Sequence, residues 1–408
     1  MFLRALPLAF VLCGLVLYAV LGGADFGAGV WQLLAGRGAR ARAIREQAHH
    51  SIGPVWEANH VWLIFVLTVF WTGYPKAFGS IASTLAVPLF IAAIGIIFRG
   101  ATYALRAGAG SVREAAAIDT IFAISSLVTP FALGAAAAAI VTGRVPVGNA
   151  AGHAFSSWLN PISVVVGLLT VANGAYLAAV YLAADAQLAH SELEGAFRRR
   201  ALAAALVAGA VALAGLLVLD AHDRALLRAL FEGGALAAVI ASGVAGVATI
   251  ALVARHLHQL ARATAAAAVA AVIAAVALAR WPTILPGLSV ARAAAGHDTL
   301  VWITVAVLAG AVILFPSLAL LFRLALTGRF RAGESLATVA AGQRERDRLR
   351  PRLLARVSAA GLVAGIGLLT FADGGWAHGV GLASLLLFAL AGFLAVVPAA
   401  VADDAESG

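Results

Sequence analysis

Apolar runs of about 20 residues recur from one end of this chain to the other, and each is long enough to cross a bilayer as a helix. Of the 408 residues, 62% are hydrophobic and only 12% are charged. A transmembrane β-barrel would need short segments of alternating polarity, whereas these runs are continuous and rich in Leu, Ala, Val and Gly. The sequence therefore predicts an all-α fold, a polytopic transmembrane helical bundle.

We expect eleven spans. The first run is interpreted as a retained span rather than a cleaved signal peptide, because its apolar sequence continues through Phe26 to Leu34. The spans are expected near residues 5–34, 53–77, 80–99, 115–141, 160–184, 201–219, 234–254, 263–281, 300–322, 354–372 and 378–400.

Basic residues gather in every second connecting loop. Most of the 28 Lys and Arg residues fall in 36–50, 99–113, 198–200, 255–262 and 323–352. Because Lys and Arg are enriched in cytoplasmic loops, this alternation predicts a multi-pass protein of the bacterial cytoplasmic membrane with a periplasmic amino terminus. With eleven spans the carboxyl terminus is cytoplasmic. The net charge of +9 then needs no nucleic-acid partner.

Three carboxylates, those of Asp25, Glu57 and Asp119, are expected inside the membrane toward its cytoplasmic side. Burying a charged side chain at the bilayer centre costs about 2.5–3.5 kcal/mol on insertion scales, so such a group indicates proton or ion transfer. Glu57 lies in the segment Ser51-Ile-Gly-Pro-Val-Trp56-Glu57-Ala-Asn59-His60-Val-Trp62. An alternative is that Glu57 lies shallow and caps the helix that follows Pro54.

Arg99 ends the third expected span and has two interpretations. The commoner case is a side chain that snorkels to phosphate head groups, and the alternative is a buried pair with a carboxylate or with a haem propionate of a partner. Asp119 also has a structural alternative. An acid in the first turn of a helix is favoured by the helix dipole, and Asp119 could pair with Arg113 or Arg99.

Haem ligation by this chain is not expected. Axial ligands should lie inside spans as His or Met, and of ten histidines only His60 is placed within one, while Met1 is the sole methionine. A single five-coordinate haem or a shared copper ligand stays open. The lone cysteine, Cys13, excludes an internal disulfide, and no metal site is expected. Phosphate-cradling loops and nucleophile elbows are absent from the sequence, which argues against ATPase or hydrolase chemistry.

Several blocks, in order, carry a family resemblance. They are Gly23-Ala-Asp25-Phe-Gly27-Ala-Gly29, the segment around Glu57, Ile96-Ile-Phe98-Arg99-Gly100, Trp158-Leu-Asn160-Pro161 and Trp281-Pro-Thr-Ile-Leu-Pro286. Together they resemble subunit II of the cytochrome bd-type quinol oxidases, and the similarity extends to about residue 325.

The resemblance implies a haem-free subunit of a quinol:oxygen oxidoreductase. Haems b and d are then expected in the partner, subunit I, with quinol as the substrate of the complex and with room for a structural quinone. A small single-span accessory subunit and membrane lipids are further expected partners. In this interpretation Asp25, Glu57 and Asp119 serve proton delivery, while Trp56, Asn59, His60 and Arg99 lie near the partner's cofactors.

The chain departs from the family pattern in three places. Glu57 stands where the family usually has Asp, and Gly22 stands where it often has a further acid, so that Asp25 would act alone in the first span. The family usually has nine spans. We therefore divide the chain into a family-like domain, 1–325, a basic cytoplasmic linker, 326–352, and a transmembrane hairpin with its tail, 353–408.

Another class of function also fits the polar residues. A secondary transporter or channel could bind its substrate or coupling ion with Asp25, Glu57 and His60 at a helix break near Pro54. A third interpretation is a membrane anchor for a different redox partner. Co-purification of a haem-bearing subunit would separate these alternatives from an oxidase subunit.

Overall fold

The computed structural model describes residues 2–36, 38–52, 56–105, 111–326, 350–371 and 375–396, and it is almost entirely helical, as expected. The elements are α1 Phe2–Leu17, a π-helix at Tyr18–Gly22, α2 Gly23–Leu33, α3 Ala39–Ile52, α4 Trp56–Gly73, α5 Pro75–Thr84, α6 Ala86–Leu105, α7 Val112–Val141, α8 Pro161–Leu188, α9 Glu194–His222, α10 Arg224–Leu230, α11 Gly233–Ala254, α12 His258–Arg280, β1 Thr283–Leu285, β2 Leu288–Ser289, α13 Val290–Ala293, α14 His297–Leu326, α16 Arg350–Phe371 and α17 Gly375–Val396.

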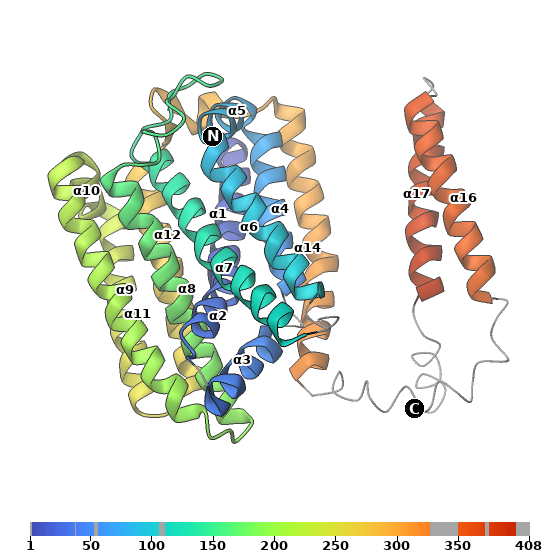
Figure 1. The fold of residues 1–408 in the computed structure, drawn as a ribbon. Helices are drawn as coiled ribbons and strands as arrows, with labels where there is room; N and C mark the ends of the chain where they lie inside the picture. Colours follow the sequence, from blue (N-terminus) through green and yellow to red (C-terminus); the bar gives the residue numbers. More distant parts are fainter. Residues whose placement is uncertain are drawn as a thin grey trace, which may run out of the picture. The chain divides into compact units, whose positions relative to one another are not determined.

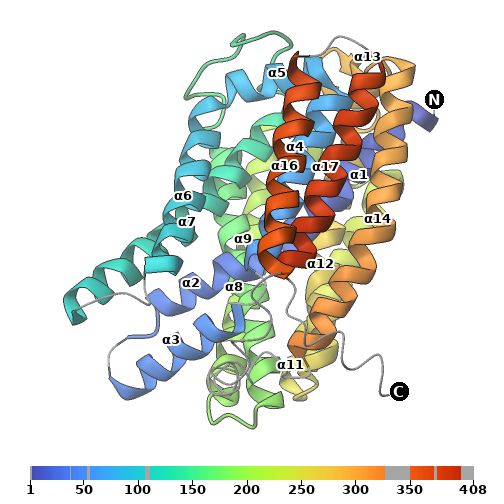
Figure 2. The ribbon, with the colours of Figure 1, turned by 90° about the vertical axis from the view of Figure 1, so that its right-hand side faces the viewer.

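The chain forms two compact units, Met1–Ile313 and Leu314–Gly408. In the first unit, α8 packs against α9, α11 packs against α12, and α12 closes on α8, so that these four long helices stand side by side (Figures 1 and 2). The α1–α2 helix packs on the other side of α8 together with α7, and α6 lies along α7. The only strands among the described residues are β1 and β2, a short antiparallel pair.

Each of the eleven expected spans overlaps at least one helix, although the number that cross a membrane stays a prediction. Among the described residues, seven helices are long and apolar enough to span a membrane, or eight if the bent pair α5 and α6 counts as one span. The first of them runs from Phe2 to Leu33 and includes the π-helix. The apolar part of α4, Asn59–Gly73, is shorter.

The third expected span, 80–99, is misplaced at its start. The chain bends by 82° between α5 and α6, so residues 80–84 belong to α5. The hydroxyls of Ser80, Ser83 and Thr84 explain why this segment is set apart. They accept hydrogen bonds from backbone N–H groups of the loop that follows α7, at Gly148, Ala150 and Gly152. Hydroxyls engaged in this way cap a loop rather than face lipid.

Helix starts follow the local sequence. Asn160 caps α8 by accepting a hydrogen bond from the Ser163 N–H at 3.1 Å, and Pro161 occupies the first turn, where its missing N–H is harmless. The segment 36–50, predicted to be a connecting loop, contains most of the helix α3. It buries Ala41, Ile44 and Ala48, a spacing of three and four residues that defines one helix face.

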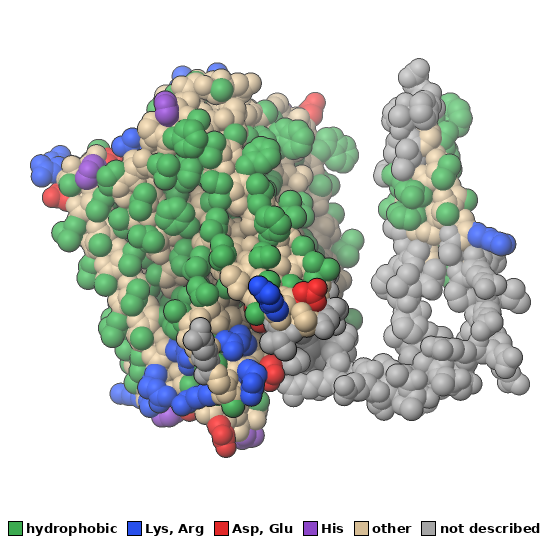
Figure 3. Space-filling model, in the orientation of Figure 1, with side chains coloured by type: hydrophobic (Ala, Val, Ile, Leu, Met, Phe, Trp, Pro, Cys, Tyr) green, Lys and Arg blue, Asp and Glu red, His purple; other side chains and the backbone are tan. Residues whose placement is uncertain are grey.

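Basic side chains gather at one end of the first unit, where α3 and the first turns of α9 lie (Figure 3). The opposite end carries α5, α10 and the two strands (Figure 1). Helix flanks between these ends expose large apolar side chains, including Leu213 at 65% and Val247 at 68%. This distribution is what a multi-pass protein with one basic face requires.

In the second unit α16 and α17 pack closely against each other, and Ser358 Oγ donates to the Phe388 carbonyl at 3.0 Å. Residues 372–374, between these two helices, lie outside the described residues, as does most of the expected linker 326–352.

Candidate functional site

Asp25 and Arg99 form an ion pair in the interior of the first unit. Arg99 Nη2, from α6, lies 2.6 Å from Asp25 Oδ1 and also donates to the Asp25 carbonyl at 2.9 Å. Both side chains are 2% exposed. The commoner interpretation of Arg99, a snorkelling side chain, is therefore wrong. The carboxylate of Asp25, on α2, pairs with the Arg99 guanidinium inside the protein, so this side chain does not extend to the lipid head groups.

The remaining contacts of Arg99 come from α7 and α2. Nη1 donates to Ser126 Oγ, whose own hydroxyl donates to the Phe122 carbonyl at 2.7 Å. The guanidinium carbon lies 4.3 Å from the ring centroid of Phe122 and 4.9 Å from that of Phe26. Two aromatic faces and three oxygen acceptors thus stabilise a cation that is removed from water.

Two glycines of the block Gly23 to Gly29 allow these helices to meet. A Cβ at Gly27 would overlap the backbone of Gly174 in α8, and a Cβ at Gly29 would overlap the side chain of Ser126 in α7. Only glycine permits such close helix contacts. The block therefore places Asp25 against α7 and α8 at a depth where Arg99 can reach it.

A π-helix precedes Asp25, and its residues contact two side chains of α4. Tyr18, its first residue, packs edge-on against Phe26 and His60, with ring centroids 6.4 Å and 6.2 Å away. The ring of His60 also lies 6.2 Å from that of Phe26. Asn59 Nδ2 donates to the Leu21 carbonyl at 3.3 Å. Such π-helical turns within α-helices are frequent at functional sites.

Only one carboxylate oxygen of Asp25, Oδ1, takes part in the ion pair with Arg99. Its Oδ2 is buried and has no hydrogen-bond partner among the described residues, and the same holds for the Tyr18 hydroxyl and both amide atoms of Gln32. Gln32 follows Asp25 by seven residues within α2, which places both on one helix face. A carboxylate anchored through one oxygen, with the other unpaired, is suited to gain and release a proton.

Four predicted site residues thus meet in space: Asp25, Asn59, His60 and Arg99. Asp119 is half-buried on α7, seven residues before Ser126. Trp56 and Glu57 lie on α4, but their side chains fall outside the described residues. The roles assigned to all seven remain predictions. Sequence reasoning missed Ser126 and Tyr18, for which the only signals were polar side chains within apolar runs.

A second polar cluster lies near the basic end. Glu194 Oε1 is 2.6 Å from Nε2 of the fully buried His258 and 3.0 Å from Nδ1 of His256, and thereby connects α9 to the start of α12. Arg262 pairs with Asp185 nearby. The three ligand atoms of the cluster lie within 4.8 Å of one another, a spacing that a divalent cation could bridge. Without an ion, the two imidazoles share Glu194 Oε1, while Nδ1 of His258 is buried and has no hydrogen-bond partner among the described residues.

A bundle of long apolar helices around a buried ion pair defines this chain as a multi-pass membrane protein. Residues 3–325 match the family model of the cytochrome bd terminal oxidase subunit II, and the chain belongs to that family. The fold of the bd oxidase from Geobacillus thermodenitrificans agrees, with a TM-score of 0.66 at 25% identity over 80% of this chain and 99% of that one.

Two curated relatives are similar over shorter stretches. Subunit 2 of the cytochrome bd ubiquinol oxidase of Bacillus subtilis is 26% identical over 149 residues, or 36% of this chain and 43% of the relative. Subunit 2 of the bd-I ubiquinol oxidase of Escherichia coli K12 is 27% identical over 186 residues, 42% of this chain and 47% of the relative. The aligned part is thus less than half of either relative. The expected resemblance to subunit II is confirmed.

Proposed function

We propose that this chain is the haem-free subunit II of a bd-type quinol:oxygen oxidoreductase. It supports a haem-bearing subunit I and contributes to the delivery of cytoplasmic protons to the site where oxygen is reduced to water. The observation that carries this proposal is the buried pair of Asp25 and Arg99, in a chain whose family is that of the oxidase subunit.

The two members of the pair have different capacities. Arg99 stays protonated, so it gives the interior a fixed positive charge. Asp25 is the member that can exchange a proton, through the Oδ2 atom that no described residue engages. Oxygen reduction consumes protons, and in this family the acceptor site lies in the partner, so a protein-held carboxylate on the supply side is what the chemistry needs.

The position of Asp25 supports a supply from the basic end. The helix that carries Asp25 continues through Gln32, which is 4% exposed, toward α3 at the end where arginines gather. By the distribution of Lys and Arg, this end faces the cytoplasm. Glu57, one turn before His60 on α4, is proposed to act on the same route.

Asp25→Asn is the direct test, because asparagine keeps the shape of the side chain and cannot carry the proton. We expect the purified complex to keep its haem content and to lose most of its quinol-driven oxygen uptake, with Asp25→Glu restoring part of it. Asp220→Asn is the matched control, since Asp220, on α9, is an exposed acid that pairs with Arg224 at the start of α10. Glu57→Gln should slow uptake in the same way.

Normal oxygen uptake by a haem-replete Asp25→Asn complex would remove Asp25 from proton delivery. Loss of haem in Asp25→Asn together with equal damage in Asp25→Glu, which keeps the carboxylate but adds a methylene, would indicate a packing role for the side chain. The hairpin of α16 and α17 lies beyond the family match, and we propose that it packs against subunit I.

A further inference from the structure

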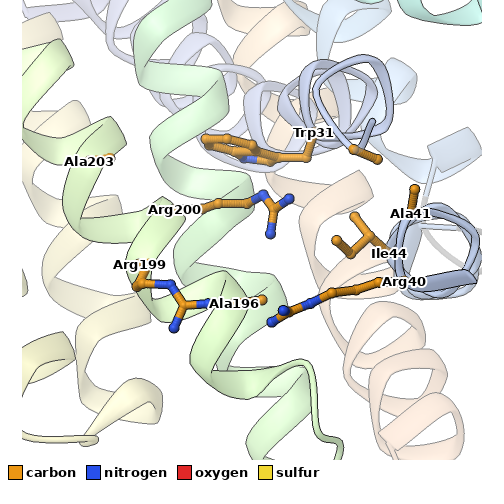
Figure 4. A pocket seen from close by; sticks show the side chains of 9 residues that line it. Trp31, Arg40, Ala41, Ile44, Ala196, Arg199, Arg200 and Ala203 are labelled. Carbon is orange, nitrogen blue, oxygen red and sulfur yellow. The ribbon is translucent and has the colours of Figure 1, made fainter. Parts of the chain in front are cut away.

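An open pocket of about 520 Å³ lies at the basic end of the first unit, between the end of α2, the helix α3 and the first turns of α9. Figure 4 shows Arg40 reaching across from α3 while Arg199 and Arg200 come from α9, with Trp31 above them and Ile44 on the α3 side. No carboxylate is among the residues that line it.

The three guanidinium groups converge without a counter-ion. In the described part of the chain, no ion pair joins Arg40, Arg199 or Arg200 to an acid, although other arginines of this chain are paired in that way. Like charges that face one cavity repel each other unless an anion lies between them. Guanidinium groups bind phosphate through paired N–H donors, so a phosphate group is the anion that this geometry favours.

Trp31 and Arg200, two of the side chains that line the pocket, are held by contacts within the protein. The Trp31 indole N–H donates to the Ala175 carbonyl of α8 at 2.8 Å, which holds the ring in place. The Arg200 guanidinium lies 5.7 Å from the centroid of Trp31 and 5.9 Å from that of Phe197. These cation–π contacts hold Arg200 at the pocket in advance of any ligand.

An apolar stripe of α9 continues from the pocket along the membrane-spanning part. Arg199, Leu206 and Leu213 recur at seven-residue intervals, and Leu217 follows four residues later, so all four lie on one helix face. The three leucines are 65–74% exposed. A ligand with an anionic head at Arg199 and an acyl chain along this stripe would match both halves of the surface.

We propose that this pocket binds the phosphate of an anionic phospholipid of the cytoplasmic leaflet, with its acyl chains on the leucine stripe of α9. Basic pockets between helices on the cytoplasmic side are suited to such head groups. The lipid would join α3 to α9, two helices whose basic faces otherwise repel each other.

The test uses the purified full-length protein with whatever subunits accompany it. Arg40→Gln/Arg199→Gln removes two exposed pocket arginines, and Arg42→Gln/Arg255→Gln removes the same charge from the same end outside the pocket. Each delipidated protein is titrated with phosphatidylglycerol, with phosphatidylethanolamine and with inorganic phosphate, and thermal stability is followed. We expect phosphatidylglycerol alone to stabilise the parent and the control, and to bind the pocket variant about 30-fold more weakly.

Four results would overturn the proposal. Equal weakening in both double variants would show that general surface charge is responsible. Equal stabilisation by phosphatidylethanolamine would remove the requirement for an anionic lipid, and stabilisation by inorganic phosphate alone would assign the pocket to a soluble phosphoryl compound. As an independent readout, a photoreactive phosphatidylglycerol should label the peptide that contains Ala196–Ala203, and labelling confined to other helices would contradict the assignment. None of these readouts depends on oxidase activity.

Discussion

The Asp25–Arg99 pair predicts an asymmetric and strongly coupled response to substitution. At an Nη2–Oδ1 distance of 2.6 Å and an effective dielectric constant of about 20, the attraction between the charges is about 6 kcal/mol before desolvation is subtracted. Breaking a buried pair by removing one partner costs about 3–5 kcal/mol, whereas replacing both partners with apolar residues of similar volume is often neutral.

The two single substitutions should differ. Asp25→Leu strands a guanidinium that cannot lose its proton, so we expect the full cost of about 3–5 kcal/mol. Arg99→Met leaves a carboxylate that can take up a proton and become neutral, so its cost should be smaller. The double variant Asp25→Leu/Arg99→Met should return to within about 2 kcal/mol of the parent, which gives a coupling energy above 1 kcal/mol.

Reversible unfolding in mixed micelles of a mild detergent and dodecyl sulfate measures these differences as shifts of the unfolding midpoint at constant slope. Leu213→Ala, on the exposed face of α9, controls for general effects of substitution within a span. Additive effects, in which the double variant is as unstable as the sum of the single variants, would refute the buried pair as a stabilising unit.

Three further predictions concern other contacts. Gly29→Ala should separate α2 from α7 and lower the yield of folded protein, because its Cβ would overlap Ser126. A Cβ at Gly209 on α9 would meet nothing within 4 Å, so Gly209→Ala should be neutral or stabilising by up to about 1 kcal/mol. Expression yields and thermal midpoints compare the two variants. Ser126→Ala should destabilise the protein by about 1–3 kcal/mol because Arg99 loses an acceptor, and unchanged unfolding midpoints would contradict this contact. Glu194→Gln should lower the thermal midpoint, because the fully buried His258 loses a charged acceptor at 2.6 Å. Glu232 is an exposed acid before α11, so the control variant Glu232→Gln should leave the thermal midpoint unchanged.

Much of the fold could be predicted from the sequence because length and hydropathy determine where helices cross a membrane. The apolar run 160–184 became α8, Pro161–Leu188, and the run 234–254 became α11, Gly233–Ala254. The bend between α5 and α6 could not be predicted in this way, since residues 77–98 form one continuous run without a charged side chain. It depends on hydroxyl contacts with a loop some 70 residues away, as between Ser80 and Gly148.

The candidate site was predictable in its members but not in its contacts. An isolated Asp25 and Arg99 within apolar runs indicated function, yet their sequence separation of 74 residues hides the ion pair. The roles of Gly27 and Gly29 also became visible only once α7 and α8 were seen against α2. The polar side chain of Ser126 within an apolar run was too weak a signal, because small polar residues are common within membrane helices.

The most direct test of the proposed function is to purify the tagged chain from its native membrane in mild detergent and to record the visible absorption spectrum and quinol-dependent oxygen uptake of the product. A subunit of a bd-type oxidase should elute with a haem-bearing partner and consume oxygen when quinol is added. A colourless, inactive and stable protein would contradict the proposal and favour a transporter that uses Asp25, Glu57 and His60.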